Sequence, residues 1–126
     1  MCLVSDMLSV GGLPAGEAEY TLTVPGVEGG LRVVVDQGVA LLADRTLNAG
    51  SITPLDRMIK ITAGYGIPIE DVVRMASETP ARVVHAARKG SVRAGFDADL
   101  CVLSAAYDVQ KTIVGGRVVY EAPANL

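Results

Sequence analysis

The sequence predicts a mixed α/β fold, because the texture of the chain changes twice along its length. Short β-branched runs separated by glycine-containing turns occupy residues 20–42. After the loop at residues 48–51 the apolar period changes from two to about 3.6, and strand-like texture returns from Gly90. We therefore expect a strand meander, a helical block and a second group of strands, in that order.

The segment before the meander indicates where chemistry could take place. Residues 2–5 read as the end of a buried strand, Asp6 stands at its tip, and a loop with Gly11, Gly12 and Gly16 follows. An acidic residue at the tip of a barrel strand lies where catalytic groups converge, although such a residue alone is more often a turn former or a helix cap. Because long glycine loops often line ligand sites, Asp6 is the candidate catalytic residue of what reads as the last part of an enzyme.

The meander and the helices are predicted from turn and cap residues. Strands are expected at residues 20–24, 31–35 and 39–42, paired antiparallel across glycine turns. Each of three helices then has a proline near its start: Pro54, Pro68 and Pro80. Thr53 can cap the first helix and Gly64 ends it. The third is expected to carry an apolar stripe of Val83, Val84 and Ala87.

The last strands are predicted at residues 99–103, 109–114 and 117–120. The first reads as a buried strand, and the other two form a hairpin, because Gly115-Gly116 suits a two-residue turn. Asp97 belongs to the turn before this group. The boundary between the helical block and the terminal strands is expected at residues 89–95.

Composition and charge limit the classes of function. Half of the 126 residues are apolar and the mean hydropathy is +0.38, yet no apolar run approaches the roughly 20 residues of a membrane span. The excess therefore predicts buried strands and helix faces, some of which expect partners absent from this chain. Cys2 and Cys101 read as small buried hydrophobes of a reducing cytoplasm, and the first residues lack a signal peptide.

A nucleic-acid partner and a metal centre built by this chain alone are not expected. The formal net charge is −3, and the basic group of Arg82, Arg88, Lys89 and Arg93 reads as a solvated helix end. His85 is the single histidine, whereas metal sites need several convergent donors.

Longer segments resemble a known family. Residues 75–82 and 89–100 resemble the closing signature of the amidohydrolase superfamily. Residues 4–7 with 12–16, the loop TLNAGSIT at residues 46–53 and the hairpin at residues 111–119 are similar to N-acetylglucosamine-6-phosphate deacetylases. The resemblance covers nearly all of this chain and roughly the last third of the family's length.

The resemblance implies both a fold and a reaction. Residues 1–92 would be the C-terminal part of a (β/α)8 metallo-dependent hydrolase barrel, and residues 93–126 the terminal strands of a small β-sandwich domain. Asp6 would be the catalytic aspartate that exchanges a proton with water and the leaving amine, and Leu47 and Asn48 would lie near the substrate's acetyl group. The family's divalent metal, zinc or iron, would be held by ligands upstream of this chain.

The resemblance also implies partners, and it leaves alternatives open. It implies an amino-sugar phosphate substrate, a cytoplasmic location, and either a homo-oligomer or the missing N-terminal part as partner of the terminal hairpin. Ser5, Met7 and Asn48 depart from the usual Thr, Ala and small residue, and Met7 is bulky enough to alter a pocket wall. The alternatives are another N-acyl amidohydrolase and a non-catalytic remnant or assembly partner. Alone, the chain is expected to be inactive.

Overall fold

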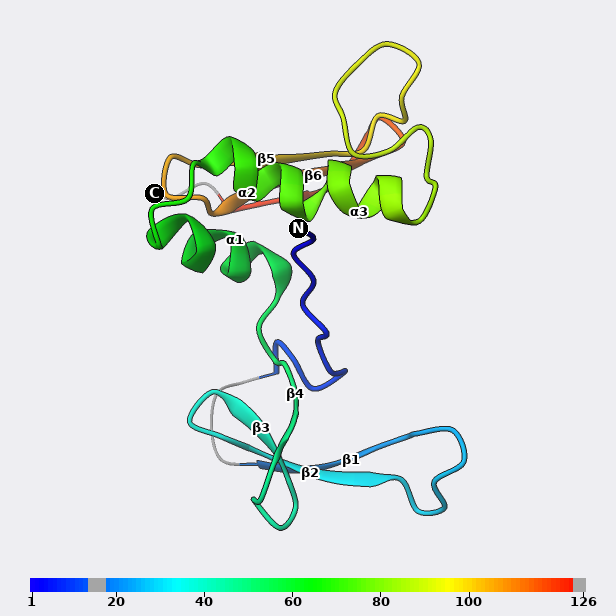
Figure 1. The fold of residues 1–126 in the computed structure, drawn as a ribbon, viewed down its shortest axis with the longest axis vertical. Helices are drawn as coiled ribbons and strands as arrows, with labels where there is room; N and C mark the ends of the chain where they lie inside the picture. The colour runs from blue at the N-terminus through cyan, green and yellow to red at the C-terminus, as the bar shows by residue number, and fades with distance from the viewer. Residues whose placement is uncertain (14–17, 124–126) are drawn as a thin grey trace. The chain divides into compact units, whose positions relative to one another are not determined.

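The computed structural model describes residues 1–13 and 18–123 as two compact units (Figure 1). One unit is Ser5–Pro54, and the other joins Met1–Val4 to Leu55–Leu126. Pro14, Ala15 and Gly16 of the predicted glycine loop lie outside the described residues. No helix in the described part of the chain is both long and apolar enough to cross a bilayer.

The Ser5–Pro54 unit is an antiparallel meander in the order β1-β2-β3-β4. Its strands are β1 (Ala18–Leu22), β2 (Leu31–Asp36), β3 (Val39–Leu42) and β4 (Asn48–Gly50). The first three confirm the predicted strands, with β1 beginning two residues earlier than expected. The fourth was not predicted, because Asn-Ala-Gly has no strand preference of its own and pairs only by contact with β3.

This unit contains a small apolar core. Val33 and Ala40 are 0% and 1% exposed, and they pack with Val10, Leu22 and Val35. Val33 is paired with Tyr20 on one side and with Leu42 on the other, so the central strand β2 is covered along both edges. The core therefore fixes the pairing of β2 with β3. Strand β4 pairs with β3 in turn and leads directly to Ser51.

The buried strand predicted for residues 2–5 does not form. Val4 is 67% exposed, and the Leu3 N–H donates instead to the Met75 carbonyl at 2.8 Å. The first ladder contact is an isolated parallel bridge between Met7 and Ser51. A buried parallel strand needs paired neighbours and covered faces, and the described residues supply only that single bridge.

The other unit begins with three helices, α1 (Leu55–Gly64), α2 (Ile69–Ala76) and α3 (Glu78–Val83). All three were predicted, and α1 ends at Gly64 as expected. Val72 of α2 is completely buried. Val83 and Val84 of the apolar stripe expected on α3 are largely exposed, and Val84 lies just past the end of the helix. His85 also lies past the end of α3 and not within it.

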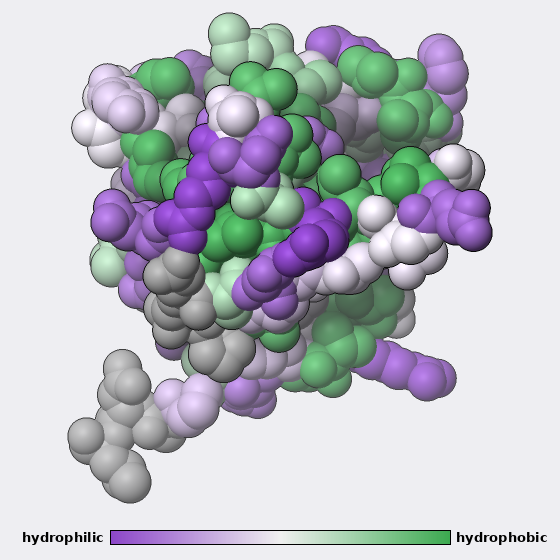
Figure 2. Space-filling view, turned by 90° about the horizontal axis from the view of Figure 1, so that it is seen from below, coloured by the Kyte–Doolittle hydropathy of each residue, from purple (hydrophilic) through white to green (hydrophobic). Residues whose placement is uncertain are grey.

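The terminal strands form a second antiparallel sheet, β5 (Leu100–Leu103), β6 (Val109–Val114) and β7 (Arg117–Glu121). The predicted hairpin is confirmed: Gly115 and Gly116 have φ of 55° and 78°, a pair of positive values that suits a type I′ turn. The prediction that β5 is buried is wrong, because Val102 and Cys101 are exposed, and Cys2 is only half-buried. Figure 2 likewise shows apolar side chains at the surface among hydrophilic ones.

A charged cluster fastens this sheet to the segment that follows α3. Lys89 Nζ contacts Asp99 and lies 3.0 Å from Asp97, and the second Asp99 oxygen accepts the Gly115 N–H at 2.8 Å. The ion pair with Lys89, followed by the bond from Gly115, lowers the pKa of Asp99, and Asp99 with Asp97 raises that of Lys89. The two aspartates therefore serve the architecture of this unit.

Candidate active site at Asp6

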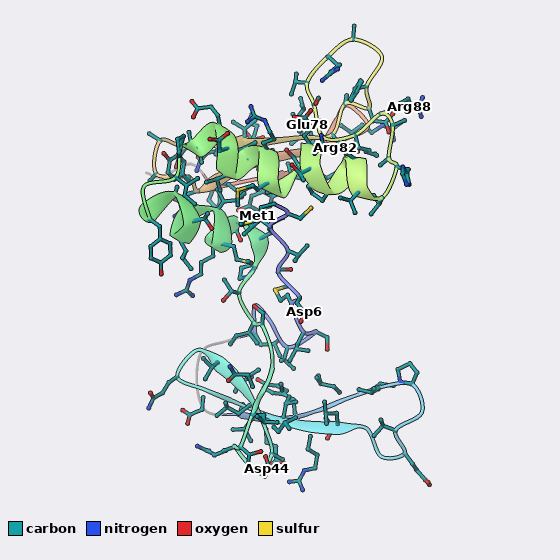
Figure 3. All side chains as sticks on the ribbon, in the orientation of Figure 1. Met1, Asp6, Asp44, Glu78, Arg82 and Arg88 are labelled. Carbon is teal, nitrogen blue, oxygen red and sulfur yellow. The ribbon has the colours of Figure 1, made fainter. Side chains whose placement is uncertain are left out.

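The main-chain conformation at Asp6 is unusual. Asp6 has φ of 45°, in the left-handed region that L residues other than Asn, Asp and His rarely occupy. Its side chain is exposed, and no hydrogen bond or ion pair of this carboxylate occurs among the described residues (Figure 3). Aspartate adopts this conformation more readily than most residues, so the feature that marks Asp6 is its exposed, uncommitted carboxylate on a hydrogen-bonded main chain.

Main-chain bonds to Ser51 hold this conformation in place. The Ser51 N–H donates to the Asp6 carbonyl at 3.3 Å, and the Leu8 N–H donates to the Ser51 carbonyl at 2.8 Å. Because these bonds bracket Met7, the segment around Asp6 runs parallel to the segment around Ser51. The Ser51 hydroxyl is occupied as an acceptor for the Thr53 N–H at 3.0 Å.

Gly50 allows the two segments to approach each other. It has φ of 140°, and a Cβ at this position would come within 3.0 Å of the Leu8 side chain. A larger residue would therefore push against the turn that follows Asp6. Sequence reasoning placed Gly50 in a loop and missed this contact, although a glycine directly before Ser51 was the available signal.

Leu47 and Asn48 lie at the opposite end of β4 from Asp6. Leu47 is 65% exposed, and its carbonyl accepts the Leu42 N–H at 2.9 Å. Four residues of extended chain separate it from Ser51, a span of about 13 Å. The structure therefore brings Ser51, not Leu47 or Asn48, next to Asp6, and contact of those two residues with a substrate stays a prediction.

The turn before Leu47 is fixed by a side chain. The Asp44 carboxylate accepts bonds from the Thr46 N–H at 3.1 Å and the Thr46 hydroxyl at 2.8 Å. These bonds lower the pKa of Asp44. Figure 3 shows Asp44 and Asp6 on opposite sides of the strands of the Ser5–Pro54 unit, so Asp44 shapes the turn and takes no part in the site at Asp6.

The described residues do not fit a catalytic metal. They contain no group of three or more His, Cys, Asp or Glu side chains that could hold one. Catalytic metal sites need about three protein ligands and an open position. What the arrangement offers is one exposed carboxylate on a fixed backbone, which is suited to accepting and donating a proton.

Comparison with known proteins decides the family. Residues 28–119 match the amidohydrolase family, which is well over half of the chain. The chain belongs to the amidohydrolase family. Members of this family are typically metal-dependent, so this amidohydrolase segment lacks, among its described residues, a feature expected of the complete enzymes.

This amidohydrolase chain is similar to curated deacetylases. It is 32% identical to an N-acetylglucosamine-6-phosphate deacetylase of Vibrio furnissii over 126 residues, which is 99% of the chain and 30% of that protein. It is 33% identical to the Rattus norvegicus deacetylase over 97% of the chain and 28% of that protein. The amidohydrolase segment thus spans somewhat under a third of the relatives it matches.

Solved structures agree with the sequence match. The chain superimposes on the Thermotoga maritima N-acetylglucosamine-6-phosphate deacetylase with a TM-score of 0.80 at 28% identity, covering 97% of this chain and 31% of that one. A Mycobacterium smegmatis deacetylase, solved in complex with N-acetyl-D-glucosamine-6-phosphate, gives a TM-score of 0.77 at 27% identity over 94% of this chain and 30% of that one. The two antiparallel sheets and the helices therefore match one part of these deacetylase structures.

Proposed function

We propose that this chain is the C-terminal segment of a metal-dependent amide hydrolase that removes the acetyl group from N-acetylglucosamine 6-phosphate. The observation that carries the proposal is the likeness to deacetylases over nearly the whole chain, in sequence and in structure. By this proposal residues 1–92 belong to the catalytic barrel and residues 93–126 to a smaller β-sandwich domain.

In this function Asp6 moves the protons. Its carboxylate takes one proton from the attacking water, whose oxygen then bonds to the acetamide carbonyl carbon. As the carbon–nitrogen bond breaks, the carboxyl group returns the proton to the leaving amine, so that acetate and a free amine result. The exposed position and the absence of a competing partner among the described residues support this role.

The rest of the site supports or shapes Asp6. The main-chain bonds to Ser51 limit the movement of the segment that carries the Asp6 carboxylate. Leu47 and Asn48, at the start of β4, would contact the acetyl group. The ligands of the metal that amidohydrolases typically use would come from protein outside this chain. Alone, the chain is therefore inactive in this proposal.

A chimera tests the proposal. The matching C-terminal 30% of the Vibrio furnissii deacetylase is replaced by this chain, and release of acetate is measured with N-acetylglucosamine 6-phosphate and with other N-acyl substrates. We expect deacetylation of the sugar phosphate in preference to the others. A folded, metal-loaded chimera that prefers another N-acyl substrate would favour a different amidohydrolase, and a folded chimera with no activity would favour a non-catalytic remnant. If the chimera does not fold, residues 5–54 alone are exchanged.

A further inference from the structure

A hollow of about 400 Å³ opens between α3 and the segment that follows it. Its lining includes three cationic side chains, an imidazole, one carboxylate and one aromatic ring: Arg82, Lys89, Arg93, His85, Glu78 and Phe96. In a chain whose formal net charge is −3, this is a local reversal of sign. Sequence analysis treated these basic residues as a solvated helix end, and the proposed hydrolase function does not use them.

The ion pairs of the region leave two guanidinium groups uncompensated. Lys89 is neutralised by Asp97 and Asp99, and the Glu78 carboxylate lies 3.7 Å from Arg74 Nε. Within the described residues, neither Arg82 nor Arg93 has a carboxylate partner. Figure 3 shows Arg82 beside Glu78 on α3. The hollow therefore retains positive charge after its internal pairs are counted.

Arg93 is held in a fixed orientation. Its guanidinium carbon lies 4.8 Å from the centre of the Phe96 ring, and Nη2 donates to the Ser91 hydroxyl at 3.3 Å. Stacking on a ring leaves the in-plane N–H groups of a guanidinium free, and their fork geometry matches oxyanions. The backbone of His85 is fixed by the end of α3, and its imidazole carries an N–H donor on the same lining.

We propose that this hollow binds a small dianionic oxyanion of the phosphate type, with Arg82 and Arg93 as its charged ligands. Two guanidinium groups and an imidazole donor offer the donors that such an anion accepts, and the hollow is large enough for a phosphate group with a small organic substituent. The binding makes no use of Asp6.

Titration with inorganic phosphate tests the site. Phosphate is added at constant ionic strength to the ¹⁵N-labelled chain, kept at a concentration below the onset of association, and amide shifts are followed by NMR. We expect saturable shifts confined to residues 78–96. Arg82→Gln should weaken binding at least about tenfold without unfolding the chain, because this side chain has no partner to lose in the described structure. Arg57→Gln, on exposed α1, is the matched control and should leave the affinity unchanged.

Other outcomes would overturn the proposal. Nonspecific charge screening would be indicated by any of three results. The amide shifts would not saturate, would be as large around Arg57 as in residues 78–96, or would be unchanged in Arg82→Gln. A second titration with glucose 6-phosphate identifies the source of the anion: tighter binding than that of inorganic phosphate indicates a sugar phosphate, and equal binding indicates the phosphate group alone.

Discussion

Asp6 and His85 both occupy the left-handed region, with φ of 45° and 56°, but for different reasons. His85 follows the last turn of α3, where its N–H donates to the Arg82 carbonyl and the Ala86 N–H donates to the Ala81 carbonyl. This pair of bonds is a Schellman motif, in which glycine is the usual residue at the position of His85. Asp6 ends no helix, and its conformation is imposed by Ser51. The positive φ of His85 is explained by helix termination, whereas that of Asp6 belongs to the candidate site.

His85→Gly should stabilise the chain, because glycine adopts a positive φ without the steric cost of a Cβ. We expect a gain of about 0.5–1 kcal/mol in the free energy of local opening of α3, measured by amide hydrogen exchange of its residues. His85→Ala keeps the Cβ and should bring no such gain. In the chimera His85→Ala should leave deacetylation within a few-fold of the parent. Equal stability of the glycine and alanine variants would refute the strain at this position.

Some elements of the fold are specified by their own local sequence, and others depend on distant segments. The hairpin of β6 and β7 was predictable because Gly115-Gly116 and β-branched flanks specify it without help from the rest of the chain. Strand β4 and the bridge between Met7 and Ser51 were not, because both depend on pairing between distant segments. Asp6 could be singled out from its place after an apolar run, but its partner Ser51 could not. The burial predicted for β5 was wrong because an apolar pattern indicates which residues could be covered and not what covers them.

Gly50→Ala should loosen the contact between the Asp6 segment and β4. The added Cβ meets Leu8 at 3.0 Å and the backbone φ is 140°, so we expect destabilisation of the meander by about 1–2 kcal/mol. Gly38→Ala is the matched control, since Gly38 has a positive φ but open space around it. The rate of amide hydrogen exchange at Val33 reports the stability of the meander in both variants. A Gly38→Ala effect as large as that of Gly50→Ala would mean that the approach of Leu8 contributes nothing.

The cluster around Lys89 should depend on pH in a known direction. The folded-state pKa of Asp99 lies below its ordinary value of 3.8, so its stabilising charge is present above that value and is lost as the pH falls through the lower, folded-state pKa. Asp99→Asn removes the charge and keeps an oxygen for the Gly115 N–H. We expect Asp99→Asn to lower the stability of the sheet at pH 7. At a pH below both the folded-state and the ordinary pKa of Asp99, the variant and the parent should be equally stable. A difference that stays constant with pH would argue against the charge of Asp99.

At the scale of the whole molecule, much of the apolar content stays uncovered. Half of the residues are apolar, yet only seven hydrophobic residues of the described chain are buried, and just one of them, Val72, belongs to the helical unit. All five residues of β7 are exposed, and this strand forms one edge of its sheet. Unpaired edges flanked by apolar residues promote association with another chain. These features fit a segment that spans about 30% of its relatives.

We therefore expect the isolated chain to associate or to unfold with low cooperativity. Light scattering after size exclusion should show oligomers that grow with concentration. Val119→Lys, on the exposed β7, should reduce them, because lysine blocks edge pairing. Val39→Lys, at an exposed residue of the internal strand β3, is the control and should not reduce the oligomers. A monodisperse monomer with a sharp two-state melt would contradict this expectation.

The proposed deacetylase function depends most directly on the role of Asp6. In the chimera with the Vibrio furnissii deacetylase, turnover of N-acetylglucosamine 6-phosphate is compared between the parent and Asp6→Asn, with the metal content measured in both. Asparagine has a similar shape but cannot carry the proton, so turnover should fall at least about 100-fold while metal content and folding stay the same. Turnover that remains within tenfold of the parent would remove Asp6 from the mechanism.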